Sequence, residues 1–585
     1  MLMLARRYTL AESLLETVQN VSGQENAPKL AHCKDLYREL RRQLGQQILQ
    51  EIELRRENGQ YRLAAAAGRV FPQEEIPPED LLRAKQLTDG LEEGLQRIEW
   101  LKQRLNHLLA GIEDPTRHQQ SAEMIRAVQE SVDLSSISNF TPFELLGRTD
   151  DLTPDAGIAL AVSCWMLGAD EAIQSFSETQ GLFEARQLVL DYLRTSSDES
   201  ELRGDLIRRL EDLEGFSAER LTAMISQLPP MQPVRIDSTT SVFRTEAGDD
   251  VMGCVGIVPP EYSEHRSYPL IIAFSRELLT AEQTLRWWQD QAARHGYIVV
   301  CPEAYDTDSA GYDASAEQHR RFLQLVCRLK TGLRVDDDRV FIAGHGIGGE
   351  AAMDMATAHP ELFAGVISIS GLGRRHFQWL AKNAPSMPWY VVVGGRQGIW
   401  YERLNILLSR LMLRNTATQA ACDILFVKYP ERGFEMFAEE SPHVFEWMKL
   451  AKRTTFPEQL NAQLLRSTDL SWSWIQLTNL PERYAQLDGP TQWADEGFKP
   501  AELEARLSNN NILRISAAPS PVTLRLSPEM PVIDLQKPLI VVSGREKTVI
   551  NFRPAFSDML EELRLTGDRK RLCYMKVPLR PKGSS

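Results

Sequence analysis

The chain has 585 residues and a formal net charge of −14, with 43% hydrophobic and 25% charged residues. This length exceeds what one hydrophobic core supports, so several domains are expected. The acidic balance argues against nonspecific binding to nucleic acid or to an anionic membrane, and no apolar run approaches the ~20 residues of a membrane-spanning helix.

The N-terminal sequence and the cysteines predict a cytoplasmic protein. The basic pair Arg6–Arg7 follows a very short apolar stretch, which is the reverse of the order in a secretory signal. The seven cysteines are scattered singly without a C-x-x-C pair, a pattern typical of reduced thiols. We expect no cofactor and no metal site, because the chain has no H-E-x-x-H motif and no paired histidines at helical spacing.

Residues 1–132 are predicted to form a helical hairpin. Two stretches carry apolar residues every three or four positions, which gives each helix one apolar face. We expect the two helices to pack antiparallel within the chain, joined through residues 59–77. A dimerising or partner-binding coiled coil is the alternative. The two apolar stripes are Leu36, Leu40, Leu44, Ile48 and Ile52, then Leu91, Leu95, Ile98, Leu105 and Leu108.

Residues 133–232 are predicted to form a second helical module that serves as an interaction or packing surface. A serine-rich break at 131–139 separates it from the first region. Thr153 and Ser217 stand where N-caps are expected, directly before apolar runs. The expected helices cover 156–167, 182–193, 200–213 and 218–228, and a proline-rich linker follows them.

Residues 233–455 show short β-rich runs that alternate with helical segments. This alternation predicts right-handed β-α-β units, and therefore a doubly wound, mostly parallel sheet. Residues 456–585 carry short apolar runs separated by Gly, Pro and Asn, which predicts a small β-sandwich-like C-terminal domain that ends in a frayed tail at 581–585. The expected central strands lie at 251–258, 268–274, 297–301, 339–343, 364–369, 389–393 and 424–428.

The motifs of the central segment follow one another in the order and spacing of the α/β-hydrolases. They are Tyr268–Ile272, Gly296–Pro302, Val335–Gly344, His359–Val366 and Phe445–Met448. The segment resembles most the prolyl-oligopeptidase-like and feruloyl-esterase-like branch, and the whole chain resembles multidomain proteins of planctomycete-type bacteria. The resemblance implies that Gly344-His-Gly-Ile-Gly348 is a nucleophile elbow, the strand-to-helix turn written G-x-S-x-G.

Each catalytic position that the resemblance implies is altered in this chain. The serine position is Gly346, and the histidine position is Phe434. The acid position falls in 394–398, which has no carboxylate, and Glu402 is the nearest one. The oxyanion loop reads Phe274-Ser-Arg276 in place of a glycine-rich motif. Loss of the nucleophile alone lowers turnover of a serine hydrolase by about a millionfold.

We therefore predict a pseudo-hydrolase that binds or scaffolds, with no catalytic residues and degenerate positions at Gly346 and Phe434. The alternative is an active serine-type esterase or peptidase with a displaced site, in which His345 or His443 and a carboxylate activate water or Cys301. Each of these residues also has a structural interpretation. His345 could be part of the elbow scaffold, His443 a surface residue and Cys301 a small core residue. The pocket-lining residues are predicted to be Ser275, Arg276, Glu303, His345, Gly346, Ile347, Arg396, Phe434 and Glu435.

Other predictions concern partners and one acidic run. The partner is an unknown small ligand or a protein, with no nucleic acid and no membrane, and the N-terminal helices could form a homo-oligomer. A third possibility is a purely structural protein whose pocket has filled in. Asp336-Asp-Asp338 is expected to be a polar turn before a strand, with Arg339 as a partner for one carboxylate.

Overall fold

The computed structural model divides the chain into two compact units. The first comprises residues 1–158, 260–263 and 294–296, and the second comprises 159–259, 264–293 and 297–585. The predicted four-domain division, with boundaries after 132, 232 and 455, stays a prediction. The structure describes residues 27–148, 152–303, 312–371, 377–399, 422–485 and 499–579, except 381, 384 and 386, together with 13, 17, 403 and 406. Glu402 and the tail 581–585 lie outside these residues.

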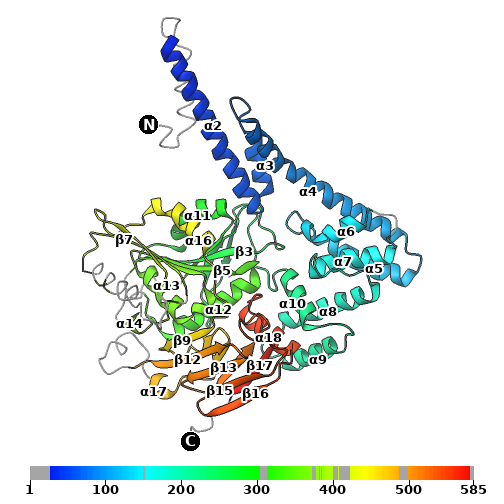
Figure 1. Ribbon diagram of the computed structural model, residues 1–585, viewed down its shortest axis with the longest axis vertical. Coiled ribbons are helices and arrows are strands. Elements are labelled where there is room, and N and C mark those ends of the chain that lie inside the picture. Colours follow the sequence, from blue (N-terminus) through cyan, green and yellow to red (C-terminus); the bar gives the residue numbers. More distant parts are fainter. Residues whose placement is uncertain are drawn as a thin grey trace. The chain divides into compact units, whose positions relative to one another are not determined.

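The first unit is helical, as predicted, but its long helices do not pack antiparallel. Arg83 pairs with Glu53 at 3.1 Å, and further along both helices Arg56 donates to the carbonyl of Gln86. The contacts advance in the same direction, so α2 and α4 run parallel, with α3 returning between them (Figure 1). The helices are α2 Ala27–Glu57, α3 Tyr61–Arg69, α4 Pro78–Ala110, α5 Pro115–Ser131, η2 Ile137–Phe140 and α6 Thr141–Leu146.

Two helices of the second module begin at serine N-caps, of which Ser217 was predicted from the sequence and Ser175 was not. Ser175 and Ser217 each accept a hydrogen bond from a backbone N–H of the first turn, which satisfies a donor that has no partner within the helix. None of the described helices combines the length and the apolar character needed to cross a bilayer. The module comprises α7 Pro154–Leu167, α8 Phe176–Arg194, α9 Ser200–Glu211 and α10 Ala218–Gln227.

The predicted doubly wound sheet is confirmed. It has eight strands in the order β1-β2-β4-β3-β5-β6-β7-β8. β2 runs antiparallel to β1 and β4, whereas β3 to β8 are mutually parallel. The strands are β1 Val242–Thr245, β2 Cys254–Ile257, β3 Tyr268–Phe274, β4 Ile298–Pro302, β5 Val335–His345, β6 Gly365–Ile369, β7 Trp389–Gly394 and β8 Ile424–Tyr429.

Helices cover both faces of this sheet (Figure 1). Trp288 of α11 and Phe445 of α16 belong to one buried cluster with alternate residues of the strands, such as Ile271 and Phe341. Because both faces are covered, every residue of β3, β4, β6 and β7 is buried, and these strands are mostly apolar. The helices are α11 Ala281–His295, α12 Ala316–Gly332, α13 Ile347–Ala358, η3 Pro360–Leu362, α14 Phe377–Leu380, η5 Ala438–Glu440 and α16 Ser441–Leu450.

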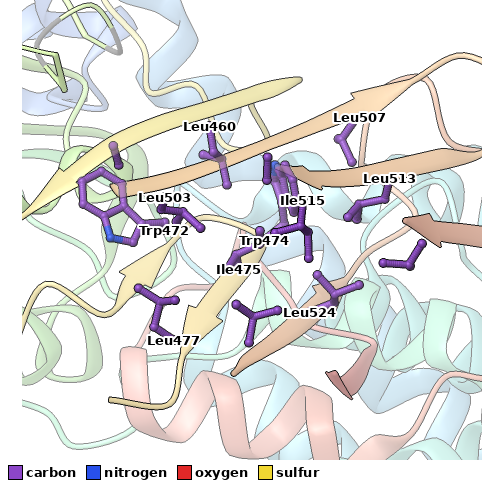
Figure 2. Close-up of a cluster of buried hydrophobic side chains, with 14 of the residues drawn as sticks. Leu460, Trp472, Trp474, Ile475, Leu477, Leu503, Leu507, Leu513, Ile515 and Leu524 are labelled. Carbon is purple, nitrogen blue, oxygen red and sulfur yellow. The ribbon is translucent and has the colours of Figure 1, made fainter. Parts of the chain in front are cut away.

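The C-terminal region contains two sheets that share one apolar core, which confirms its β-rich character. Figure 2 shows Leu503 and Leu513 of one sheet and Ile475 and Leu524 of the other pointing into the same buried layer. The four-stranded sheet comprises β10 Ser471–Trp472, β11 Ile475–Leu477, β14 Val522–Leu526 and β17 Met575–Leu579. The five-stranded sheet comprises β16 Glu546–Ile550, β15 Leu539–Ser543, β13 Ile512–Ala517, β12 Ala501–Ser508 and β9 Gln459–Leu464, beside the short helix α17 Glu482–Ala485 and the unpredicted α18 Phe556–Thr566.

A buried ionic network connects the central sheet to α18 and the turn that follows it. Asp568 is fully buried and accepts from Arg453 at 2.5 Å and from Lys330 at 3.1 Å. Lys330 also pairs with Asp337 at 2.9 Å. The acidic run at 336–338 is thus part of β5, and its outer members Asp336 and Asp338 pair with Lys570 and Arg453, which are far away in the sequence. The predicted polar turn with Arg339 as partner was wrong, because Arg339 donates to the Tyr297 hydroxyl.

Substituting Asp568→Asn should destabilise the protein by about 3–5 kcal/mol, because it leaves two buried cations without their shared carboxylate. The measurement is denaturant unfolding of the full chain. The matched control is Asp205→Asn, which removes an exposed pair with Arg208 and should change stability by less than about 1 kcal/mol. Equal effects of the two substitutions would contradict this role for Asp568.

The same carboxylate should make stability depend on pH in acid. Desolvation opposes its charge, but Arg453 and Lys330 outweigh it and hold the pKa of Asp568 well below its ordinary value. A depressed folded pKa gives stability that is present above the unfolded pKa of about 3.9 and is lost as pH falls through the folded pKa. The Asp568→Asn variant should therefore show a flatter loss of stability below about pH 4 than the wild type.

Candidate functional site

The elbow predicted from the sequence forms a sharp turn between β5 and α13. β5 ends at His345, α13 begins at Ile347, and Gly346 between them has φ +59° and ψ −120°. L side chains rarely adopt this conformation. A Cβ on Gly348 would lie 2.5 Å from the carbonyl oxygens of Phe274 and Ser275. The glycines therefore allow the first turn of α13 to approach β5 and β3 at backbone distance.

The ring of Phe434 lies where a side chain of residue 346 would project. A Cβ on Gly346 would lie 2.7 Å from Cζ of Phe434. The ring centroid of Phe434 is 4.8 Å from that of His345, and its side chain remains half exposed. The structure thus brings together the two positions that the resemblance implies for nucleophile and base. Neither glycine nor phenylalanine carries a group that can attack a carbonyl or accept a proton.

His345 is a neutral, buried side chain held by the loop that carries Phe434. Its Nε2 lies 2.9 Å from the carbonyl oxygen of Glu435, and a carbonyl can only accept, so Nε2 carries the proton. Burial lowers the pKa of His345 to about 4, with a further lowering by Arg276, against the opposing hydrogen bond to Glu435. An imidazole with so low a pKa is a weak general base at neutral pH.

Glu277 lies beside the elbow, and sequence reasoning missed it. Its Oε2 would be 3.1 Å from a Cβ on Gly346, at the N-terminus of α13. A carboxylate is favourable beside the partial positive charge of a helix N-terminus. It would repel the negative charge that develops on a substrate carbonyl during acyl transfer. Glu277 could have been identified from the sequence by its position shortly after β3, in the expected oxyanion loop.

Gly394 and Gly395, the first two residues of the predicted acid position at 394–398, have no room for a side chain. A Cβ on Gly394 would lie 2.5 Å from the carbonyl oxygen of Arg432. A Cβ on Gly395 would lie 2.8 Å from Cα of Pro430. The loop after β7 is therefore packed, backbone against backbone, on the loop after β8. This packing requires glycine at the first two positions of the loop in which the resemblance implies the acid.

The other predicted pocket residues fall into two groups. Ser275, Arg276 and Ile347 adjoin the elbow, and Ser275 is buried. Arg396 and Glu435 form ion pairs with Glu431 and Arg432 respectively, on the loops after β7 and β8.

Glu303 lies at the end of β4, two strands from β5 in the sheet. It is 3.9 Å from Arg244, and its N–H donates to the Gly253 carbonyl. It therefore faces the antiparallel edge of the sheet and does not join Gly346.

Two of the residues proposed for a displaced catalytic site, His443 and Cys301, do not lie at the elbow. His443 is exposed near the start of α16. Cys301 is fully buried in β4, and burial raises the pKa of its thiol to about 12, which leaves little thiolate at neutral pH. These placements agree with the structural roles that the sequence offered as alternatives.

Residues 249–412 match the Esterase family model, described as "Putative esterase". With the strand order and the elbow, this match assigns the central domain to the α/β-hydrolase superfamily. The finer branch, prolyl-oligopeptidase-like or feruloyl-esterase-like, stays a prediction, as does the likeness to planctomycete-type proteins. A search of curated proteins finds no match to the chain.

Several solved hydrolase structures are similar to the central part of the chain. An S-formylglutathione hydrolase from Agrobacterium tumefaciens is 15% identical, over 37% of this chain and 98% of that chain, with a TM-score of 0.31. The fluorophosphonate-binding serine hydrolase FphF from Staphylococcus aureus is 13% identical, over 37% and 98%, with a TM-score of 0.30. Est1E from Butyrivibrio proteoclasticus is 15% identical, over 36% and 96%, with a TM-score of 0.28.

Replacing Gly344→Ala should destabilise the central domain strongly. The new Cβ would overlap the Gly348 carbonyl and lie 2.6 Å from the amide nitrogen of Gly349, and neither backbone atom can move without displacing α13. Overpacking of this kind typically costs about 1–3 kcal/mol or more. Thermal and denaturant unfolding would measure the loss.

The matched control is Gly181→Ala in α8, where an added Cβ meets nothing within 4 Å. Alanine is the better helix former by about 1 kcal/mol, so this variant should be neutral or stabilised. A neutral Gly344→Ala would contradict the close approach of strand and helix described above.

Proposed function

We propose that the central domain acts as a non-hydrolytic binding or scaffolding module that keeps the α/β-hydrolase fold. The contact of Phe434 with Gly346 carries this proposal. Acyl transfer through the usual triad needs a nucleophile, a base and a preorganised oxyanion site. At the corresponding places stand a glycine, an apolar ring and the carboxylate of Glu277. An elbow of this composition can hold a ligand or a partner, but it cannot form an acyl-enzyme.

The surroundings of the elbow support binding by shape and apolar contact. Phe434 presents a half-exposed ring above Gly346, and His345 stays neutral beneath it. Charged groups are supplied by Arg276, which follows β3, and by the Arg432–Glu435 ion pair in the loop that carries Phe434. A ligand with an apolar part and a polar end fits these features better than a strongly anionic one, because Glu277 already occupies the N-terminus of α13.

The alternative function, hydrolysis by a displaced site, would need a base near a competent nucleophile. His345 donates its Nε2 proton to a carbonyl, and His443 lies exposed on α16. The thiol of Cys301 is buried with a raised pKa. No described geometry favours this alternative, so it enters as an outcome of the experiment below.

The full-length wild type should not react with a fluorophosphonate probe and should not hydrolyse short acyl esters or proline-containing peptides. The reason is that Gly346 leaves no hydroxyl at the elbow. In-gel labelling and spectrophotometric assays would measure this, with an active serine hydrolase as the positive control. Labelling of any serine, or turnover that one point mutation abolishes, would overturn the proposal and favour the displaced site.

Binding is tested separately with a thermal-shift panel of short fatty acids, acyl esters and their alcohols. For any ligand that stabilises the wild type, the Phe434→Ala variant should raise the Kd at least tenfold, because the ring forms the wall above the elbow. The Phe552→Ala variant serves as a control, since Phe552 packs against the C-terminal core. A ligand whose affinity is equal in wild type and Phe434→Ala would place binding elsewhere.

Installing Gly346→Ser alone should destabilise the domain and yield no esterase activity. The positive φ costs about 1–3 kcal/mol for a residue with a side chain. The new Cβ would also press on Phe434. Adding Phe434→Ala should remove the steric contact with the ring and recover the stability lost through it. A double-mutant cycle should therefore show a coupling free energy of about 0.5–3 kcal/mol. Activity in Gly346→Ser alone would show that a base other than residue 434 serves the elbow.

A further inference from the structure

A second group of chemically active side chains lies far from the elbow, where α12 and α13 meet the C-terminal sheets. His319 belongs to α12, His359 follows α13, and Asp469 lies in the turn between β9 and β10. One ligating atom from each of the three lies within 4.8 Å of the others. All three side chains are buried, with at most 1% of their surface exposed. The residues are widely separated in sequence, so no motif announces the cluster.

His319 has the orientation of a metal ligand that is fixed by a carboxylate. Its Nε2 lies 3.0 Å from the Tyr312 hydroxyl and 3.2 Å from Oδ2 of Asp354, and that carboxylate oxygen also accepts from the Tyr312 hydroxyl. Its Nδ1 faces His359 and lies 3.0 Å from Nε2 of that residue. Metal-binding histidines almost always donate their second N–H to a carboxylate or carbonyl in this way, which leaves the lone pair of the other nitrogen for the ion.

Asp469 supplies the independent observation. Its Oδ2 accepts from the backbone N–H groups of Leu465 at 3.0 Å and Arg466 at 3.1 Å. Its Oδ1 is buried without a hydrogen-bond partner among the residues that the structure describes. A buried carboxylate oxygen without a partner is costly. The turn around it is held in place, since Trp472 donates its indole N–H to the Asp469 carbonyl.

We propose that His319, His359 and Asp469 bind a divalent transition-metal ion, with zinc as the best match. Two imidazole nitrogens and one carboxylate oxygen are a donor set that suits Zn²⁺. Zinc–nitrogen bonds of about 2.0–2.1 Å in tetrahedral geometry place two nitrogens about 3.3 Å apart, so the histidine pair needs to open by only a few tenths of an ångström. The fourth position is completed by water or by the second oxygen of Asp469.

The ion would connect two parts of the second unit. His319 lies in α12 and His359 directly follows α13, both in the central domain, whereas Asp469 belongs to the C-terminal β region. Arg466 contacts Asp354 at 2.6 Å and lies 3.8 Å from Oδ2 of Asp469, and Oδ1 of Asp469 has no hydrogen-bond partner among the described residues. A bound ion would act as a structural cross-link, since all three side chains are buried.

The experiment is a zinc titration of the full-length protein after dialysis against EDTA, followed by calorimetry and elemental analysis. We expect one equivalent of Zn²⁺ per chain with a Kd in the micromolar range or below, and a rise of a few degrees in the unfolding midpoint on zinc addition. Cobalt substitution should give the visible absorption of a low-symmetry nitrogen and oxygen site. Binding of less than about 0.1 equivalent by the wild type overturns the proposal, whatever the variants do.

Two variants test the assignment of the ligands. Asp469→Asn keeps the volume and an acceptor for the backbone N–H groups, and His359→Gln removes one nitrogen. Each should raise the Kd for zinc by at least tenfold, whereas His443→Gln, which changes an exposed histidine, should leave it unchanged. Circular dichroism confirms that each variant is folded. Undiminished binding in either folded variant would place the zinc elsewhere and overturn the proposal.

Discussion

The architecture of the central domain depends on one close approach, that of β5, β3 and the first turn of α13. No side chain fits between these backbones at Gly344 or Gly348, and the turn at Gly346 has a positive φ. In an active hydrolase this approach would lift a nucleophile above the sheet. Here the approach is complete although the nucleophile is absent. The constraint is therefore one of packing, and the fold can satisfy it without any catalytic group.

The elements predicted from the sequence are those whose signals are local. Buried strands such as Tyr268–Phe274 and Ile298–Pro302 are continuous apolar runs, so they were found within a residue or two. The relative directions of helices and strands are not encoded in local sequence signals. α2 and α4 run parallel because the short helix α3 returns between them. The alanine-rich sequence of α3 has no apolar stripe from which this helix could be predicted. The helix Phe556–Thr566 was missed because it follows a series of strands, where the surrounding pattern favoured β structure.

The same distinction applies to the candidate site. Gly346 and Phe434 could be identified by their places in a family pattern, but the contact of the ring with the glycine depends on how the loop after β8 folds back. Glu277 and the partners of Asp337 could not be read from spacing, because they meet through tertiary packing. Ion pairs such as Asp568 with Arg453 join residues more than a hundred positions apart. Charge runs in a sequence do not reveal such partners.

Phe434, Gly346 and Glu277 depend on one another. The ring can lie over residue 346 because that residue lacks a Cβ. Under the proposed non-hydrolytic role, the carboxylate of Glu277 can stand beside the N-terminus of α13, because no oxyanion would form there. Each feature makes a return to the usual catalytic group at a neighbouring position less favourable, through steric overlap or through charge repulsion. The altered positions thus form one coherent surface, and a binding role for that surface requires no further change in the fold.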